Sequence, residues 1–166
     1  NRRSRGLGDV YKRQLLQYVC GLFHQYGALL SGRFDIAVDL GEKSLLYNSD
    51  DPYLGIQLIP QSPLITYHIG NGMAQISMGD FEGANTSLAN SEHWANQLDS
   101  WLEGWAVIKM QLCRHAGAIG DFVGQLRHGE EGVAYAEEAD TYYVRALTYY
   151  SYGQALFDAG ELARAK

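Results

Sequence analysis

Along most of this chain, apolar residues recur at steps of three and four, which is the spacing of residues on one face of an α-helix. One such run ends before Gly120 and consists of Leu98, Leu102, Trp105, Leu112 and Ala116. The pattern predicts helices over about 14–30, 33–47, 63–78, 81–97, 100–118, 121–137 and 140–159, with an eighth beginning at 161. No alternating pattern typical of strands competes with it, so we expect an all-α fold.

The segment 48–63, NSDDPYLGIQLIPQSP, interrupts the helical pattern. It contains Pro52, Pro60 and Pro63, which are the only prolines in the chain. Proline lacks a backbone donor and clashes with the preceding helical turn, so this segment cannot continue a helix. We therefore expect a long irregular connection between the second and third helices.

A short motif occurs four times, as SGRFDIAVD at 31, MGDFEGANT at 78, IGDFVGQLR at 119 and AGELARAK at 159. Its glycines are Gly32, Gly79, Gly120 and Gly160, separated by 47, 41 and 40 residues. Periods of this length are typical of solenoids built from helical hairpins. We expect each glycine to take the left-handed conformation that ends one helix, and an Asp at the next position to help begin the following helix.

Small residues keep a fixed position relative to these glycines. Ala37, Ala84 and Ala165 follow theirs by five residues, and Gly72 and Gly153 precede theirs by seven. This pattern resembles the tetratricopeptide repeat (TPR), in which the two helices of a pair cross at small residues. The resemblance implies a TPR-like helical-hairpin solenoid of about three and a half helix pairs over residues 15–166. A helical bundle in which the glycines recur by chance is the alternative.

Some polar residues depart from the repeat pattern. They stand where the repeat usually has bulky apolar residues, and they are His68, Asn71 and Gln75 in the second pair and Lys109 and Gln125 in the third. These departures leave the register of the second and third pairs open.

A narrower resemblance covers most of residues 30–166. The order of DPYLGIQLIPQSPL, MGDFEGA, WLEGWAVIK and GVAYAEEADTYYVRALTYYSYGQALFDAGELARA is similar to the repeat region of large bacterial signalling proteins. Such proteins join this region to a class III adenylate/guanylate cyclase domain and an AAA-type ATPase, or to an ATPase and a LuxR-type DNA-binding domain. The resemblance implies a protein–protein interaction or regulatory scaffold module. The alternatives are a fragment of a cyclase or ATPase whose catalytic domains lie outside this chain, and a helical domain that senses a small ligand.

The net charge of the chain changes from positive to negative near residue 14. The whole chain has a formal charge of −6, from 13 Lys and Arg against 19 Asp and Glu. Residues 1–14, NRRSRGLGDVYKRQ, contain five of these basic residues and one acidic residue, which leaves 8 against 18, or −10, for residues 15–166. An acidic body repels phosphate backbones and anionic lipids, so we expect neither nucleic acid nor a membrane as a partner.

Residues 1–14 resemble translated adapter sequence joined to a truncated gene, and a functional basic arm is the alternative. We exclude this segment from the fold as a non-native extension. Both ends look cut, so the repeat domain over 15–166 is interpreted as a fragment of a longer protein.

The chain lacks the short motifs of common catalytic sites. It contains no GxxxxGK[ST] phosphate loop, no HExxH zinc motif and no GxSxG nucleophile turn. His128 and Glu131 have the nearest metal-like spacing, but structural zinc sites use four ligands. We expect no catalytic residue, cofactor or metal, and no enzyme activity from this chain. Cys20 and Cys113 lie far apart in apolar helical patterns, where Cys commonly serves as a small hydrophobic residue, so we expect a reducing, cytoplasmic setting.

The TPR resemblance also implies a binding surface. In these repeats the first helices of successive pairs line a concave face, and carrying this over selects Met73, Met110, Arg114, Tyr150 and Gln154. The expected partner is a protein or peptide, or another domain of the same parent chain.

The last helical segment is rich in tyrosine. Most of its five tyrosines are expected to pack between helices, and they are Tyr142, Tyr143, Tyr149, Tyr150 and Tyr152. The end of the row, around Tyr149, Leu156 and Leu162, is expected to be exposed, so we expect the isolated chain to self-associate there.

Overall fold

The structure is a computed structural model that describes residues 2–48, 50–99 and 101–165, with side chains from residue 11 onward. Seven helices lie within these ranges: α1 (Arg2–Leu30), α2 (Phe34–Leu45), α3 (Pro63–Met78), α4 (Phe81–Ala95), α5 (Leu102–Ala118), α6 (Phe122–Ala139) and α7 (Tyr142–Asp158). These ranges contain no strand. The all-α fold class predicted from the sequence is confirmed.

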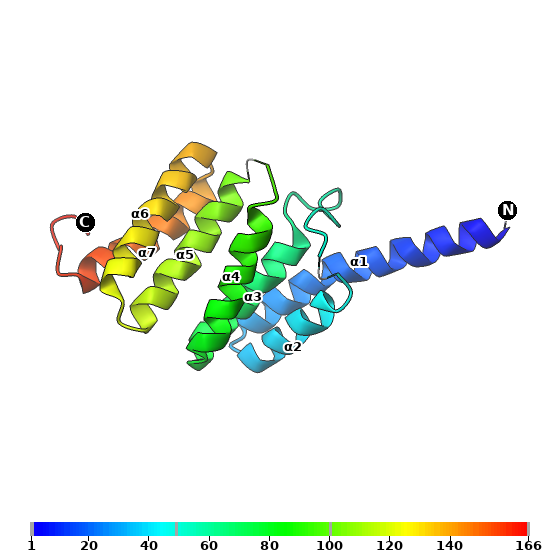
Figure 1. The fold of residues 1–166 in the computed structure, drawn as a ribbon, viewed down its shortest axis with the longest axis horizontal. Coiled ribbons are helices and arrows are strands. Elements are labelled where there is room, and N and C mark those ends of the chain that lie inside the picture. Colours follow the sequence, from blue (N-terminus) through cyan, green and yellow to red (C-terminus); the bar gives the residue numbers. More distant parts are fainter. Residues whose placement is uncertain (1, 49, 100, 166) are drawn as a thin grey trace.

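The two ends of the predicted pattern differ from the structure. α1 begins at Arg2 rather than near residue 14, and its N-terminal part projects beyond the other helices (Figure 1). The first buried side chain among those described is Leu15. The helix predicted from 161 is a single turn, in which the Ala165 amide donates to the Glu161 carbonyl at 3.2 Å. A lone turn orders several residues for very few hydrogen bonds, which is why nucleating a helix is costly.

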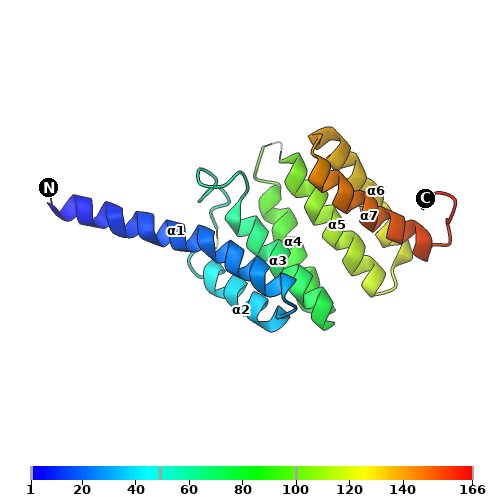
Figure 2. The same ribbon diagram turned by 180° about the vertical axis from the view of Figure 1, so that it is seen from behind.

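The helices pack side by side in a row that follows their order in the sequence (Figure 1; Figure 2 shows the opposite face). α1 contacts α3, α3 contacts α5, and α5 contacts α7, so the odd-numbered helices form one layer. α2, α4 and α6 each contact the odd-numbered helices on either side of them in the sequence. Consecutive helices run in opposite directions, so α3, α5 and α7 point the same way. α1 and α7 lie at opposite ends of the row.

The repeated motif forms the turns that it predicts. The four repeat glycines lie in the left-handed region, with φ of 71° at Gly32, 79° at Gly79, 78° at Gly120 and 77° at Gly160. Asp80 begins α4 by accepting a hydrogen bond from the Gly83 amide at 3.0 Å. Asp121 begins α6 in the same way, accepting from the Gly124 amide at 2.9 Å. These capping interactions confirm the predicted turn chemistry at both positions.

The connection between α2 and α3 is irregular, as its prolines predict. Pro63 occupies the first turn of α3, where its missing N–H is not needed, and Ser62 caps this helix by accepting from the Ile65 amide at 3.5 Å. The Tyr53 hydroxyl donates to the Gln97 carbonyl at 2.7 Å, which ties the connection to the end of α4.

The apolar core is divided into four clusters that follow one another along the row. The first two hold α1 and α2 against α3, the third joins α3, α4 and α5, and the fourth joins α5, α6 and α7. Ala37 and Ala84, the small residues of two second helices, are fully buried. A Cβ added at Gly72 would lie 2.8 Å from Leu88, which confirms a close approach of α3 and α4 at this glycine.

Polar residues in the first half of the row form a buried hydrogen-bonded cluster. Gln25 of α1 donates from Nε2 to Asn71 Oδ1 of α3 at 2.8 Å and to the Ala37 carbonyl of α2 at 3.2 Å. A Cβ at Gly41 would lie 2.0 Å from Asn71, and one at Gly70 would lie 2.4 Å from Gln25. The two glycines therefore make room for the paired amides. Asn71, which stands where the repeat usually has an apolar residue, thus takes part in a polar contact among three helices.

Lys109 of α5, another departure from the pattern, lies between acidic residues of two neighbours. Its Nζ is 3.0 Å from Glu92 Oε1 of α4 and 2.9 Å from Glu131 Oε2 of α6, and its side chain is 14% exposed. Burial lowers the pKa of Lys109, but hydrogen bonds with Glu131 and Glu92 outweigh this effect and raise it overall. These ion pairs link α4 and α6 through α5.

Candidate partner-binding face

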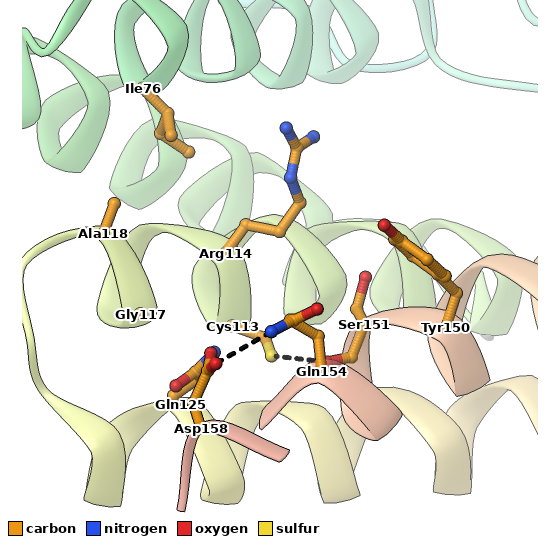
Figure 3. A pocket seen from close by; sticks show the side chains of 10 residues that line it. All are labelled: Ile76, Cys113, Arg114, Gly117, Ala118, Gln125, Tyr150, Ser151, Gln154 and Asp158. Carbon is orange, nitrogen blue, oxygen red and sulfur yellow. Dashed lines mark hydrogen bonds between the residues drawn. The ribbon is translucent and has the colours of Figure 1, made fainter. Parts of the chain in front are cut away.

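A pocket of about 370 Å³ opens in the layer of odd-numbered helices (Figure 3). We call it the α5–α7 pocket, because these two helices supply most of its walls. Ile76 of α3 stands at one edge and Gln125 of α6 contributes from the second layer. The remaining lining residues are Cys113, Arg114, Gly117 and Ala118 of α5 and Tyr150, Ser151, Gln154 and Asp158 of α7.

Three of the five residues selected from the sequence meet at this pocket. They are Arg114, Tyr150 and Gln154, and all three are exposed. Met110 is only 7% exposed and belongs to the core. Met73 is partly buried and packs against the apolar clusters on both sides of α3. The methionines thus contribute packing, whereas the three polar or aromatic residues form part of an accessible surface.

Arg114 brings a positive charge to the open side of the pocket. Its guanidinium rises from α5 between Ile76 and Tyr150 in the view of Figure 3. It donates from Nη1 to Gln111 Oε1 at 3.1 Å. No ion pair involving Arg114 occurs among the described residues, so its other donors are free to bind an incoming carboxylate in the two-pronged manner of guanidinium groups.

Asp158 brings a negative charge to the same pocket and is held by two amides. Gln125 donates from Nε2 to Asp158 Oδ2 at 2.9 Å, and Gln154 donates from Nε2 to Oδ1 at 2.8 Å. These bonds fix the Gln125 amide with its nitrogen toward the carboxylate. Gln125 Oε1 is buried and has no hydrogen-bond partner within the described part of the chain.

Sequence reasoning missed Asp158 as a pocket residue. A signal for Gln125 was present, because a polar residue at an expected packing position indicates a buried polar contact. Its partner could not be identified in this way, since the two residues are separated by 33 positions along the chain.

The cysteines differ from each other in their surroundings. Cys113 is buried at the wall of the pocket and donates from Sγ to the Ser151 carbonyl at 3.6 Å. Burial raises the pKa of the Cys113 thiol to about 11, so it remains protonated and is a poor nucleophile at neutral pH. Cys20, by contrast, is exposed on α1. The apolar pattern around it includes residues on the outer side of α1.

The prediction that most tyrosines of α7 pack between helices is wrong. Four of them are largely exposed: 88% at Tyr142, 70% at Tyr143, 51% at Tyr149 and 77% at Tyr150. α7 contacts α5 and α6, and no other helix of the described chain covers its far side.

The predicted exposure at the end of the row is correct for Tyr149 and for Leu162, which is 55% exposed, but wrong for Leu156, which is 3% exposed. The segment 161–165 folds back over α7, where Arg164 donates from Nη2 to the Tyr152 hydroxyl at 2.7 Å.

His128 and Glu131 lie close together, with His128 Nδ1 3.7 Å from Glu131 Oε2. Glu131 is already paired with Lys109, and burial, Arg127 and Lys109 together lower the pKa of His128. Within the described ranges no three His, Cys, Asp or Glu side chains are grouped to hold a metal ion. None of the helices in these ranges is both long and apolar enough to cross a membrane.

The chain matches no family model, no curated protein and no solved structure. The similarity to tetratricopeptide regions, and to signalling proteins that contain them, therefore stays a prediction from the sequence.

Proposed function

We propose that this chain is a protein–protein interaction module of the TPR type, and that a peptide segment of its partner binds across the α5–α7 pocket. One observation carries the proposal. Arg114, Tyr150 and Gln154, which the repeat pattern selects for a concave face, line a single pocket. The contact of successive odd-numbered helices, α1 to α3 to α5 to α7, supports a solenoid, since each helix pair then meets only its neighbours.

The pocket offers three kinds of contact to a peptide. Arg114 can bind an acidic side chain, and the exposed ring of Tyr150 supplies a broad apolar surface with a polar tip. Asp158 can accept hydrogen bonds from backbone amides or from a basic side chain on the other side of the pocket. Arg and Tyr are among the residues that contribute most to binding at protein interfaces.

A library of short random peptides displayed on phage tests this proposal. Selected peptides are synthesised with a fluorescent label, and their affinity is measured by fluorescence anisotropy. Arg114→Ala and Tyr150→Ala should each weaken binding by about tenfold or more. Arg127→Ala and Tyr143→Ala are matched controls, because both residues are exposed and lie outside the pocket. Equal losses in the controls, or unchanged affinity in the pocket variants, would contradict the proposal.

One observation favours a small-ligand sensor as a second candidate. Arg114 and Asp158 face the same pocket but form no ion pair with each other. A pocket of about 370 Å³ lies within the range of small-molecule sites, and its opposite charges suit a zwitterion such as a free amino acid. Thermal unfolding with each amino acid at millimolar concentration tests this candidate. A stabilisation that disappears in Arg114→Ala supports it, and the absence of any shift favours the peptide.

We also propose that the module belongs to a larger cytoplasmic signalling protein of bacterial type. Its acidic body, at −10 over residues 15–166, supports a protein partner rather than nucleic acid. Reading the coding sequence on both sides of this segment distinguishes the two versions of the parent protein. A cyclase domain with a phosphate-loop ATPase indicates the cyclase parent, and a helix-turn-helix domain downstream indicates the transcriptional regulator.

A further inference from the structure

α1 carries an apolar stripe on the side that faces away from the row. Leu16, Phe23 and Leu30 are 52%, 67% and 88% exposed, at intervals of seven residues. Cys20 and Gly27 are exposed between them, so that the stripe continues at steps of four and three. The opposite side of α1 contributes to the apolar clusters shared with α2 and α3. The α1 stripe, defined by these five residues, therefore forms one end face of the molecule.

α7 carries a similar stripe at the other end of the row. Tyr142, Tyr149 and Phe157 are 88%, 51% and 61% exposed, and Ala146 is exposed between the tyrosines. Their spacing of four, three and eight residues places them on one side of the helix. We call these four residues the α7 stripe. It consists of residues that do not line the α5–α7 pocket, so the two surfaces of α7 are distinct.

The charges beside the two stripes are opposite in sign. Residues 11–33 contain no Asp or Glu. Arg33 follows the α1 stripe, and Lys12 and Arg13, which belong to the segment 1–14 expected to be non-native, precede it in the chain as given. Three acidic residues at 137–140 precede the α7 stripe, and the segment 158–161 contributes two more after it. Arg145 pairs with Glu137 and Asp140, and Arg164 pairs with Glu161, which leaves residues 137–165 with a formal charge of −3. Two α1 faces, or two α7 faces, would bring like charges together. An α1 face against an α7 face brings opposite charges together at both ends.

We propose that copies of this chain associate head to tail, with the α1 stripe of one copy packed against the α7 stripe of another. In this arrangement α1 of one copy packs beside α7 of the other in the same way that α7 packs beside α5 within one copy. The two helices at the contact run parallel. In this register Leu16 lies beside Tyr142, Cys20 beside Ala146, and Phe23 beside Tyr149. The contact joins two different faces, so it leaves one free face at each end and assembly can continue. The inference is independent of the proposed peptide site.

A mixing experiment with the full chain tests the association. The wild-type chain should grow beyond a dimer as its concentration rises, as measured by light scattering. Phe23→Glu blocks the α1 face and Tyr149→Glu blocks the α7 face, so each variant alone should be monomeric at concentrations where the wild type assembles. An equimolar mixture should form dimers and nothing larger, because only one intact pair of faces remains. Val123→Glu is the matched control, since Val123 is 81% exposed on α6 and outside both stripes.

A cross-linking experiment tests the register. In Ala146→Cys, a short bismaleimide should join the new thiol to Cys20 of the next copy and give a ladder of dimers, trimers and larger species. Val123→Cys is the matched control, because Val123 is 81% exposed on α6 outside both stripes and its new thiol should give no such ladder. Cys113 is 1% exposed and inaccessible in both variants.

Three results would overturn the proposal. One is a wild-type chain that stays monomeric at every concentration. Another is a mixture of the two Glu variants that stays monomeric although each retains its helical circular dichroism. The third is a ladder in Val123→Cys as extensive as the one in Ala146→Cys.

Discussion

Lowering the pH from 7 to about 5 should destabilise this protein through His68 of α3. This imidazole is partly buried, and burial lowers its pKa from 6.5 to about 4. The native state therefore keeps His68 neutral in a range of pH where the unfolded chain binds a proton. Stability from this residue is fully present above pH 6.5 and is lost as the pH falls toward about 4.

The magnitude follows from the difference between the two pKa values. Each pH unit between them is worth about 1.4 kcal/mol, so the free energy of unfolding should fall by about 2 kcal/mol between pH 7 and about pH 5. Urea unfolding followed by circular dichroism at several pH values measures this loss. Other groups also titrate as the pH falls, so the informative quantity is the difference from a variant without this imidazole.

His68→Leu should lose about 2 kcal/mol less than the wild type over this range, because leucine does not titrate. His24→Leu, which removes an exposed imidazole, is the matched control. Parallel stability curves for the wild type and His68→Leu would refute the reasoning, since they would mean that His68 binds its proton equally well in both states.

Three further results are expected. Gly72→Val should cost about 1–3 kcal/mol of stability, because its side chain meets Leu88, and Leu88→Ala should recover part of this loss in a double-mutant cycle. Lys109→Ala should cost about 1–3 kcal/mol by leaving two partly buried carboxylates without their partner, and adding Glu131→Gln should cost less there than in the wild type. Deleting residues 1–14 should change the free energy of unfolding by less than about 0.5 kcal/mol, since the described side chains of this segment are exposed. A larger loss in that deletion would identify the segment as part of the fold.

Local features of the sequence were sufficient to predict the helices α2 to α7 and the turns at the repeat glycines. A glycine at Gly79 followed by Asp80 specifies a left-handed end and a capped start, whatever packs around them. The apolar spacing also located the first packed residue of α1, since the side chains of 11–14 are exposed and Leu15 is buried. These predictions depend only on residues within one or two turns of each other.

Exposure could not be predicted in the same way, because an apolar stripe does not reveal whether another element covers it. Cys20 and Tyr142 both lie in apolar patterns, yet both are exposed because their helices end the row. Leu156 has the opposite outcome, because it is 3% exposed although it lies near the end of the same helix. The pocket could not be predicted either, because one of its walls depends on the hydrogen bond between Gln125 and Asp158. This bond joins two helices, and such a contact leaves no periodic signal in the sequence.

Because the core is divided into four clusters, the helices should differ in how readily they open, and α3 should open least readily. α3 contributes Tyr67 to the first cluster, Ala74 to the second, and Ile65 and Ile69 to the third. α7 contributes to the fourth cluster alone. Opening of α7 leaves three clusters intact, whereas opening of α3 breaks three of them together. Amide hydrogens of α3 should therefore exchange with solvent most slowly and those of α7 much faster, so that the chain melts from its ends toward a single central helix.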